Sequence, residues 1–308
     1  MKVLMISGDP TLLDPKSRAF GRLELQRAQV ERLDVFVWPQ IHSLGTILKA
    51  VHGQHYDVVT AQDPFWRGHL AWHLARRMHA RLNLQVHTDL AAQPWWRLVW
   101  AYVQLRRADS VRVVSERLKK EMASHIRAPI FVVPIYIDLA PFLGLAHTHN
   151  PRFEKTILWI GRFEAEKDPE NALAVLKQVR AAGVDAGLIL LGAGSEDARL
   201  RSEARRLTLP VEFPGWQNPL PYLQMADVVL STSRFESYGA SIIEALAAGV
   251  PVVAPNVGIA KEAGAIVVPR SNLAAAVLEV LRSGRRGKLL LSMPSAQEWA
   301  KRWRETLI

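Results

Sequence analysis

Short apolar runs of strand length alternate with helix-length segments along most of this chain, and this alternation restricts its fold more than any other feature. In the first part we expect helices at 41–52, 66–80, 95–107 and 116–125, and strands at 2–7, 33–38 (ended by Pro39), 56–61, 84–87, 110–114 and 130–133. Nearly continuous apolar strands are typical of parallel sheets that are buried on both faces. The alternation therefore predicts an α/β fold with a mostly parallel sheet covered by helices.

The alternation stops at 134–156, a stretch rich in proline and polar residues that is typical of an interdomain connection. It then resumes, with strands expected at 157–160, 186–191, 211–213, 228–231 and 252–254, helices at 169–182, 196–207, 219–225 and 240–248, and closing segments at 266–268, 272–283 and 295–307. We therefore predict two Rossmann-like, doubly wound domains, 1–140 and 141–308, facing a cleft that binds a ligand at the carboxyl ends of the strands. The last helix, at about 293–308, could pack back on the first domain.

The composition restricts the possible functions of the chain more than it restricts the possible folds. With 49% hydrophobic and 22% charged residues, the 308-residue chain has the make-up of a globular protein, which excludes disorder and a coiled coil. The absence of cysteine excludes disulfides and cysteine-based metal sites. A net charge of +10 favours an anionic partner, namely nucleic acid, anionic lipid or a phosphorylated substrate, unless it is only a basic background. No leader or membrane span is apparent, so we expect a cytoplasmic protein that could associate with a membrane face.

The densest polar cluster is the segment 231–251, STSRFESYGASIIEALAAGVP. A strand ends at its start, and a helix is expected from Gly239 or Ala240 to Ala248. The first N–H groups of a helix form an anion site, and Glu236 and Glu244 flank it. Carboxylates are poor phosphate ligands but good acceptors for sugar hydroxyls, so the pair suits a nucleotide sugar. The alternative is that both are solvated surface charges.

Three weaker clusters also follow predicted strands. In WIGRFEAEKD, Arg162 and Lys167 could clamp a diphosphate, although an ordinary charged loop fits the interleaved acids as well. In LGAGS, a Gly-x-Gly turn would let a phosphate approach the backbone, but Asp197 stands where the third glycine of a dinucleotide site would be. In QVHTD, Asp89 could orient His87 for catalysis, whereas a lone histidine is more often structural. No Asp-x-Asp is present, so we expect a metal-free phosphate clamp.

As a set, these motifs resemble the GT-B glycosyltransferases, specifically glycosyltransferase family 4. Its Glu-x7-Glu signature with a following Ala-Gly-x-Pro turn is matched by Glu236, Glu244 and 248–251. Its Gly-Arg…Glu-Lys motif is matched at 161–167, and its Gly-x-Gly, Phe-x-Gly, connection and first-domain His motifs at 192–194, 213–215, 133–142 and 85–89. The resemblance is strong over about 157–270 and looser over 56–142.

The resemblance implies a retaining, metal-independent transfer of a sugar from a UDP- or GDP-linked donor to an acceptor hydroxyl, with no cofactor. It implies catalytic roles for His87, Arg162, Lys167 and Glu236. Donor contacts would come from Gly161, Gly192, Gly194, Gly215, Ser237, Tyr238, Gly239, Ala240, Ser241 and Glu244, and the acceptor side would include Gly8, Asp9 and Asp89. The acceptor would be a glycan or a lipid-linked molecule of glycan or cell-envelope biosynthesis.

Three departures from the family pattern bear on the acceptor. The usual Glu-Gly-Phe-Gly is Glu-Ser-Tyr-Gly at 236–239, the first-domain glycine-rich loop is replaced by SGDPTLLDPKS at 7–17, and Ile135-Tyr136 stand where Asn-Gly is common. Two other functions stay open. One is a non-catalytic nucleotide-sugar-binding protein of the same fold, and the other is a nucleic-acid-binding protein, which we do not expect because no recognition motif accompanies the charge.

The segment 94–107, PWWRLVWAYVQLRR, combines aromatic residues with arginines. Such a helix suits the headgroup layer of a membrane, which would fit a lipid-linked acceptor. The alternative is that the tryptophans belong to the core and that a face of Leu98, Val99, Tyr102 and Leu105 packs on the first-domain sheet. The exposure of the tryptophans distinguishes the two.

Overall fold

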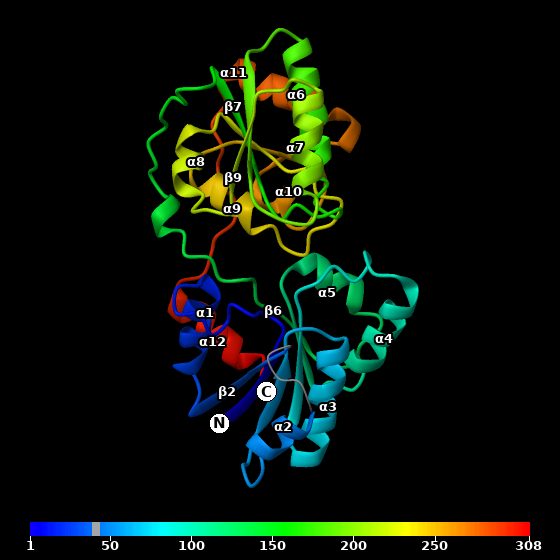
Figure 1. Ribbon diagram of the computed structural model, residues 1–308. Coiled ribbons are helices and arrows are strands. Elements are labelled where there is room, and N and C mark those ends of the chain that lie inside the picture. The colour runs from blue at the N-terminus through cyan, green and yellow to red at the C-terminus, as the bar shows by residue number, and fades with distance from the viewer. Residues whose placement is uncertain (39–43) are drawn as a thin grey trace. The chain divides into compact units, whose positions relative to one another are not determined.

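A computed structural model describes residues 1–38 and 44–308 of the chain. The chain forms two compact units, one of Met1–Tyr136 together with Met293–Ile308 and one of Ile137–Ser292 (Figure 1). Each unit contains a parallel sheet of six strands. The prediction of two doubly wound parallel α/β domains is confirmed.

The sheet of unit 1 has the order β2-β1-β3-β4-β5-β6. Its strands are β1 (Lys2–Ser7), β2 (Arg32–Val37), β3 (Val58–Ala61), β4 (Arg81–Val86), β5 (Ser110–Val113) and β6 (Ile130–Val132). Its helices are α1 (Arg18–Arg27), α2 (Leu44–Ala50), α3 (Trp66–Met78), α4 (Trp95–Leu105), α5 (Glu116–Met122) and α12 (Ala296–Glu305). The strand order reverses between β1 and β3, and such switch points are where open α/β sheets bind ligands.

The sheet of unit 2 has the order β12-β11-β10-β7-β8-β9, so its reversal lies between β7 and β10. Its strands are β7 (Lys155–Ile160), β8 (Ala186–Leu191), β9 (Val211–Gly215), β10 (Val228–Leu230), β11 (Val252–Ala254) and β12 (Ile266–Val267). Its helices are η1 (Ala140–Phe142), α6 (Pro169–Ala181), α7 (Asp197–Arg206), α8 (Leu220–Met225), α9 (Ala240–Ala247), α10 (Ala260–Ala263), η2 (Arg270–Asn272) and α11 (Leu273–Ser283). Helices α6 and α7 lie on one side of the sheet and α8 and α9 on the other (Figure 1).

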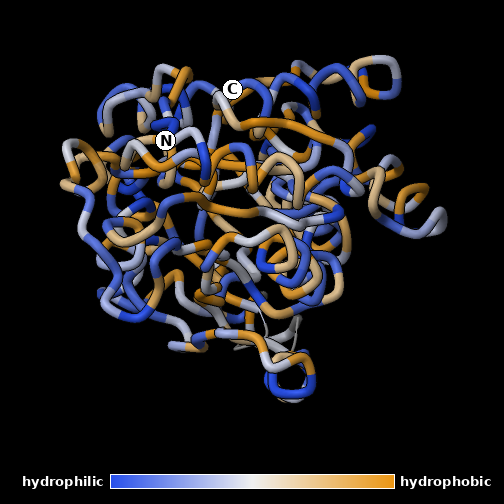
Figure 2. The backbone as a smooth tube through the Cα atoms, turned by 90° about the horizontal axis from the view of Figure 1, so that it is seen from above, coloured by the Kyte–Doolittle hydropathy of each residue, from blue (hydrophilic) through white to orange (hydrophobic). Residues whose placement is uncertain are grey.

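Apolar strands form the core of each unit, and hydrophobic and hydrophilic stretches alternate along the coloured parts of the tube (Figure 2). In unit 1, α12 packs against α1 and buries Trp299 and Trp303. The Trp303 indole joins the apolar core formed with β1 and β2, and the Trp299 Nε1 donates to the Pro134 carbonyl at 2.7 Å. The C-terminal helix is therefore part of the first compact unit.

Of the α-helices in the described residues, two were absent from the sequence prediction, and α1 is the larger of them. Ser17 caps it, because the Ser17 hydroxyl accepts a hydrogen bond from the Phe20 N–H at 2.9 Å. The arginines and Gly21 of α1 obscure its helical pattern in the sequence, because only Ala19 and Leu23 form a buried apolar stripe. The other is the four-residue α10. The expected helix at 41–52 is observed as α2, while its predicted start at 41 and the boundary at Pro39 lie outside the described residues.

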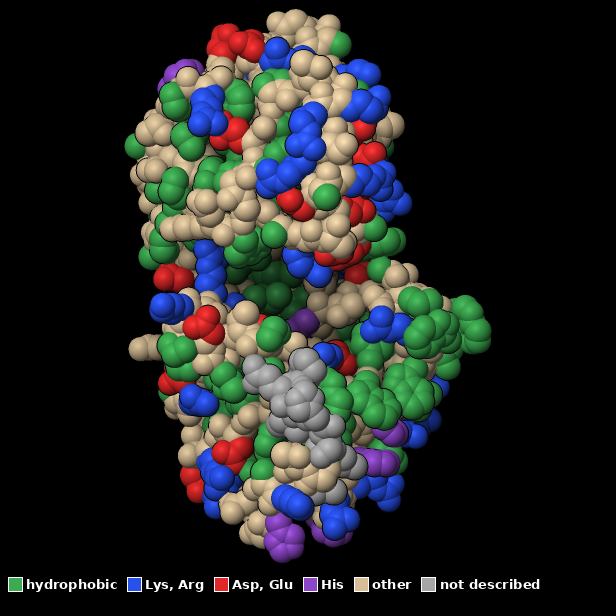
Figure 3. Space-filling model, in the orientation of Figure 1, with side chains coloured by type: hydrophobic (Ala, Val, Ile, Leu, Met, Phe, Trp, Pro, Cys, Tyr) green, Lys and Arg blue, Asp and Glu red, His purple; other side chains and the backbone are tan. Residues whose placement is uncertain are grey.

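Helix α4 turns its tryptophans outward. The exposed fractions of Trp95 and Trp96 are 77% and 58%, and that of Val99 is 57%. The buried face is formed by Ala101, Gln104 and Leu105, so the core interpretation of the paired tryptophans is wrong. Hydrophobic side chains gather over α4 on the surface of unit 1 (Figure 3). None of the helices in the described ranges is long and apolar enough to cross a membrane.

Candidate functional site

The polar clusters of unit 2 lie at its switch point. The loop 161–168 follows β7 and the loop 231–239 follows β10, and these two strands are neighbours in the sheet. The carboxyl ends of adjacent parallel strands meet at one edge, so the two loops are held side by side. The backbone N–H of Arg234 donates to the carbonyl of Glu166 at 2.8 Å and ties one loop to the other.

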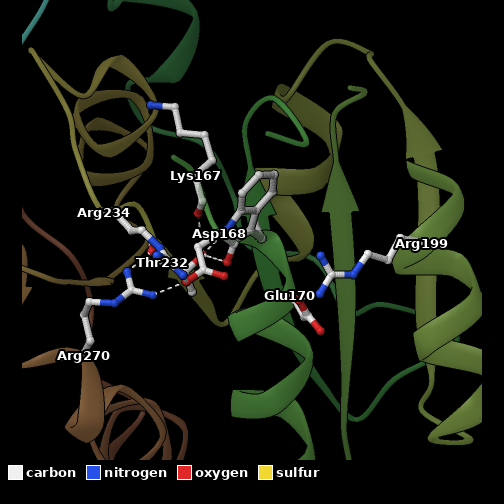
Figure 4. A network of polar contacts seen from close by, with 8 residues as sticks. Lys167, Asp168, Glu170, Arg199, Thr232, Arg234 and Arg270 are labelled. Carbon is white, nitrogen blue, oxygen red and sulfur yellow. Dashed lines mark hydrogen bonds and ion pairs between the residues drawn. The ribbon is translucent and has the colours of Figure 1, made fainter. Parts of the chain in front are cut away.

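A network of polar contacts fastens the same two loops (Figure 4). The Thr232 hydroxyl lies within 2.9 Å of the Lys167 carbonyl and 2.8 Å of the Asp168 carbonyl, and it accepts from the Trp159 indole N–H at 2.8 Å. The Asp168 carboxylate pairs with both Arg234 and Arg270. Asp168 has a left-handed backbone, with φ of 49°, which costs a non-glycine residue free energy. These contacts hold that conformation in place.

Two of the predicted catalytic residues meet directly. The Lys167 Nζ is 2.5 Å from the Glu236 Oε1, and both side chains are largely buried. The Ser233 hydroxyl also donates to this carboxylate oxygen at 3.0 Å. The structure therefore brings together a cation from the first loop and a carboxylate from the second, at the end of the sheet where the sequence predicted a diphosphate and a sugar.

The start of α9 presents backbone amides at the same place. Gly239 precedes the helix with φ of 104°, a conformation that favours glycine, and it has no side chain to cap the first N–H groups. The Tyr238 carbonyl accepts from the Ile259 N–H at 3.0 Å, and a side chain on Gly258 would collide with it. Ser237, Ala240 and Ser241 surround this turn and are partly exposed.

Glu244 lies one turn into α9 and is buried, with 5% of its surface exposed. The interpretation of Glu244 as a solvated surface charge is therefore wrong. Gly249 follows the helix with φ of 75°, as expected for its left-handed end. Glu236 is also mostly buried, so both carboxylates of the Glu-x7-Glu pattern are removed from bulk water.

The glycines of the Gly-x-Gly turn, Gly192 and Gly194, allow the backbone of the 161–168 loop to pack closely against this turn. A Cβ on Gly192 would lie 1.8 Å from the Gly161 carbonyl oxygen, and one on Gly194 would lie 2.5 Å from the Phe163 carbonyl oxygen. Gly192 N donates to the Gly215 carbonyl at 3.0 Å, and Gly215 has φ of 82°. The space that these glycines leave is filled by the backbone of 161–163, so any effect on a ligand passes through that loop.

Arg162 stands apart from Lys167 in its contacts. Its side chain is 64% exposed, and its guanidinium donates to Glu166 at 2.7 Å. On the same loop, the Ser195 hydroxyl and N–H donate to Glu164, and these bonds lower the pKa of that carboxyl. Arg162 is thus a surface cation next to a loop whose shape is fixed by Glu164 and Lys167.

The first-domain residues line a pocket of about 340 Å³ in unit 1, at the carboxyl ends of β1, β3 and β4. Gly8, Asp9 and His87 all contribute to it. The His87 Nε2 is buried and has no hydrogen-bond partner within the described residues. Burial, with the nearby charges of Arg112 and Arg22, lowers the pKa of His87 to about 3, so the imidazole is neutral at pH 7.

Asp89 is engaged elsewhere than at His87. One oxygen of its carboxylate accepts from the Ala91 N–H at 3.1 Å, and the other pairs with Arg117 at 2.8 Å. The Asp9 carboxylate likewise accepts from the N–H and hydroxyl of Thr11. Both carboxylates therefore have structural partners, Asp9 within its own loop and Asp89 in its loop and in α5.

Sequence reasoning missed several residues that shape the two sites. They are Asp168, Thr232, Arg234 and Arg270 in unit 2, and Arg22, Arg67 and Arg112 in unit 1. The Ser17 cap could have located α1 and with it Arg22, but the partners of Asp168 are 64 or more positions away in sequence. Within the described ranges, no group of three or more acidic or histidine side chains is arranged to hold a metal.

Comparison with known proteins assigns this architecture to a class. Residues 6–141 match a family described as Glycosyltransferase Family 4, and residues 154–283 match one described as Glycosyl transferases group 1. An Anabaena protein, HepE, solved with UDP and glucose, superposes with a TM-score of 0.71 over 100% of this chain and 95% of that one, at 18% identity. The fold is that of the GT-B glycosyltransferases.

Two curated relatives come from Mycobacterium tuberculosis. A glycogen synthase is 31% identical over 218 residues, which are 65% of this chain and 49% of that protein. A GDP-mannose-dependent α-(1-6)-phosphatidylinositol dimannoside mannosyltransferase is 33% identical over 131 residues, 39% of this chain and 34% of that protein. This chain thus spans about half the length of the glycogen synthase. With both family matches, it belongs to the GT-B glycosyltransferases of the family 4 type.

The neutral state of His87 predicts a pH-dependent stability. Its pKa is about 3 in the folded protein and near 6.5 when unfolded, so below pH 6.5 the unfolded chain binds a proton that the folded chain does not. The free energy of unfolding should therefore fall as the pH drops from 7 towards 4. Urea unfolding should show a smaller fall for His87→Gln, while His55→Gln, at an exposed position, should follow the wild type. Parallel curves for His87→Gln and the wild type would contradict this.

Proposed function

We propose that this chain transfers a sugar from a UDP- or GDP-linked donor to an acceptor hydroxyl, with retention at the anomeric carbon and without a metal or a cofactor. The observation that carries the proposal is the pairing of the 161–168 and 231–239 loops at the switch point of unit 2, directly before the start of α9. A cation, a carboxylate and uncapped helix amides there match a ligand that has both phosphates and hydroxyls.

In this proposal the donor diphosphate takes Lys167 from its present partner. The Nζ of Lys167, the guanidinium of Arg162 and the amides near Tyr238 to Ser241 neutralise the leaving group. Preorganised positive charge at the departing diphosphate supplies the main catalytic effect. Metal independence is supported by these cations, which can provide the charge that a divalent ion would otherwise supply.

The two glutamates recognise the hydroxyls of the donor. Glu244, one turn into α9, accepts from the ribose, and Glu236 accepts from the transferred sugar once Lys167 has moved to the phosphate. In the reaction the bond from the anomeric carbon to the phosphate oxygen breaks and a bond to the acceptor oxygen forms. The acceptor proton leaves to the departing phosphate. We assign the acceptor to unit 1, where Gly8, Asp9 and His87 line the pocket.

The first test is donor binding in the presence of EDTA. Glu244→Gln keeps the shape of the side chain but removes charge-assisted hydrogen bonds worth roughly 1.5–3 kcal/mol, so donor affinity should fall about tenfold or more. Glu279→Gln, on the exposed side of α11, is the matched control and should bind as the wild type does. Calorimetry with UDP- and GDP-sugars measures both.

Two results would contradict this proposal. Unchanged affinity in Glu244→Gln would make Glu244 a structural residue, and loss of turnover in EDTA with rescue by magnesium would disprove metal independence. Turnover itself separates an enzyme from a non-catalytic nucleotide-sugar-binding protein, since only the enzyme releases the free nucleoside diphosphate.

We further propose that unit 1 contacts the surface of an anionic membrane through α3 and α4. Trp66, Trp95 and Trp96 are each more than half exposed on these helices. The segments 66–78 and 95–107 contain no Asp or Glu, whereas arginines are frequent in both. Exposed aromatic rings beside cations suit a headgroup layer. The phosphatidylinositol in the name of the mycobacterial relative supports a lipid-linked acceptor, with this chain working at the cytoplasmic face.

Vesicle binding tests this contact. The double variant Trp95→Ala with Trp96→Ala should bind phosphatidylglycerol vesicles about tenfold more weakly in co-sedimentation, which corresponds to a loss of about 1.4 kcal/mol. Its melting temperature should stay unchanged. Salt should release the wild type. Trp216→Ala, at an exposed position in unit 2, is the control and should bind normally. If vesicles never bind the wild type, or if the control is weakened equally, the contact does not exist.

A further inference from the structure

The pocket of unit 1 is rich in arginine. Its lining comes from the ends of β1, β3 and β4, from α1 and from the start of α3, next to the β1/β3 switch point. Three guanidinium groups reach it, from Arg22, Arg67 and Arg112, against two carboxylates, from Asp9 and Asp63. Because His87 is neutral, the lining carries a net positive charge.

Arg112 forms a fixed part of this pocket. It is 2% exposed and donates to the carbonyls of Val133 at 3.1 Å and Pro134 at 3.0 Å, and to the Gln85 side chain at 2.7 Å. Its guanidinium lies 5.5 Å from the ring of Trp299. These three acceptors are neutral, and they fix the orientation of the Arg112 guanidinium.

Arg67 is held over the end of β1. It pairs with Asp63 four residues before it, and the other oxygen of Asp63 accepts from the Phe65 N–H at 2.8 Å. A Cβ on Gly8 would lie 2.1 Å from the Arg67 Nη2, so glycine at this position lets the guanidinium lie against the backbone. The charge of Arg67 is largely balanced by Asp63.

Arg22 is different from the other two. It projects from α1, it is mostly buried, and among the described residues it forms neither a hydrogen bond nor an ion pair. Burial lowers its pKa more than the nearby Asp9 raises it. A half-buried guanidinium with open donors gains most from an anionic ligand that supplies the missing acceptors.

His87, which directly follows β4, lines the same pocket, and its Nε2 has no hydrogen-bond partner among the described residues. It is buried, and it lies in the field of Arg22 and Arg112. A neutral imidazole can bond to a hydroxyl or a phosphate oxygen there. Two unsatisfied polar groups, one cationic and one neutral, thus converge on a space of about 340 Å³, which is the size of a small ligand.

We propose that the acceptor is a phosphorylated molecule whose phosphate binds Arg22 in this pocket, with His87 Nε2 bonded to an adjacent oxygen of the same acceptor. The inference rests on the proposed glycosyltransferase function and adds the chemical class of the acceptor. Either a phospholipid headgroup or a soluble sugar phosphate supplies this chemistry. The lining residue Arg67 directly follows the exposed Trp66, and Arg97 of α4 stacks on Phe65 at 4.3 Å, so the pocket adjoins the proposed membrane surface.

The test compares Arg22→Gln with Arg27→Gln. Arg27 lies on the same helix and pairs with Glu24 at the surface, so it changes the net charge equally without touching the pocket. In calorimetry, inorganic phosphate and glucose 6-phosphate should bind Arg22→Gln about tenfold more weakly than the wild type, and Arg27→Gln should match the wild type. Arg22→Lys, which keeps the charge but not the planar fork, should give an intermediate loss and guards against a folding defect.

A second arm uses vesicles of phosphatidylinositol in phosphatidylcholine. Weaker binding of Arg22→Gln than of Arg27→Gln would support the lipid source, and equal vesicle binding with an Arg22-dependent affinity for glucose 6-phosphate would support the soluble source. If Arg22→Gln and Arg27→Gln behave alike with every probe, the inference is overturned. Binding of UDP and GDP is measured in parallel: normal nucleotide binding with no Arg22 effect rejects only the phosphorylated acceptor, whereas absent nucleotide binding rejects the proposed function.

Discussion

The left-handed turn at Asp168 holds the site of unit 2 together. Its carboxylate lies between Arg234 and Arg270, and the Thr232 hydroxyl bridges its carbonyl to the Trp159 indole inside the core. A non-glycine residue in this conformation costs about 1–3 kcal/mol, and the paired arginines and hydrogen bonds offset that cost. Lys167 directly precedes this turn, and its Nζ lies 2.5 Å from the Glu236 carboxylate, with both side chains largely buried.

The chemistry of the site follows from that constraint. Lys167 and Glu236 satisfy each other while no ligand is bound, which avoids leaving either charge buried alone. In the proposed function a donor replaces both halves of the pair: its diphosphate binds Lys167 and its sugar hydroxyls bind Glu236. In unit 1, by contrast, Arg22 has no hydrogen-bond or ion-pair partner among the described residues, and we propose that an anionic ligand supplies one. The two units therefore differ in how they hold charge before a ligand arrives.

The sequence predicted the strands well because they are apolar runs with few alternatives, as β1, β8 and β11 show by their matching bounds. It predicted the loop positions of Lys167 and Glu236, but not their contact, because residues 69 positions apart carry no local signal of pairing. It missed α1, whose arginines and Gly21 weaken the apolar stripe, and so it missed Arg22. The sequence did not determine which face of α4 is buried, because tryptophans at helical spacing suit a core and a surface equally. The exposure of Trp95 in the structure shows that the tryptophans face outward.

Amide hydrogen exchange with and without UDP or GDP tests the central claim most directly. If the two loops and the start of α9 form the donor site, bound nucleotide should slow exchange in 161–168 and in 231–242 together, while exchange at the β1/β3 edge of unit 1 stays as in the unliganded protein. Protection confined to unit 1, or to only one of the two loops, would contradict the account.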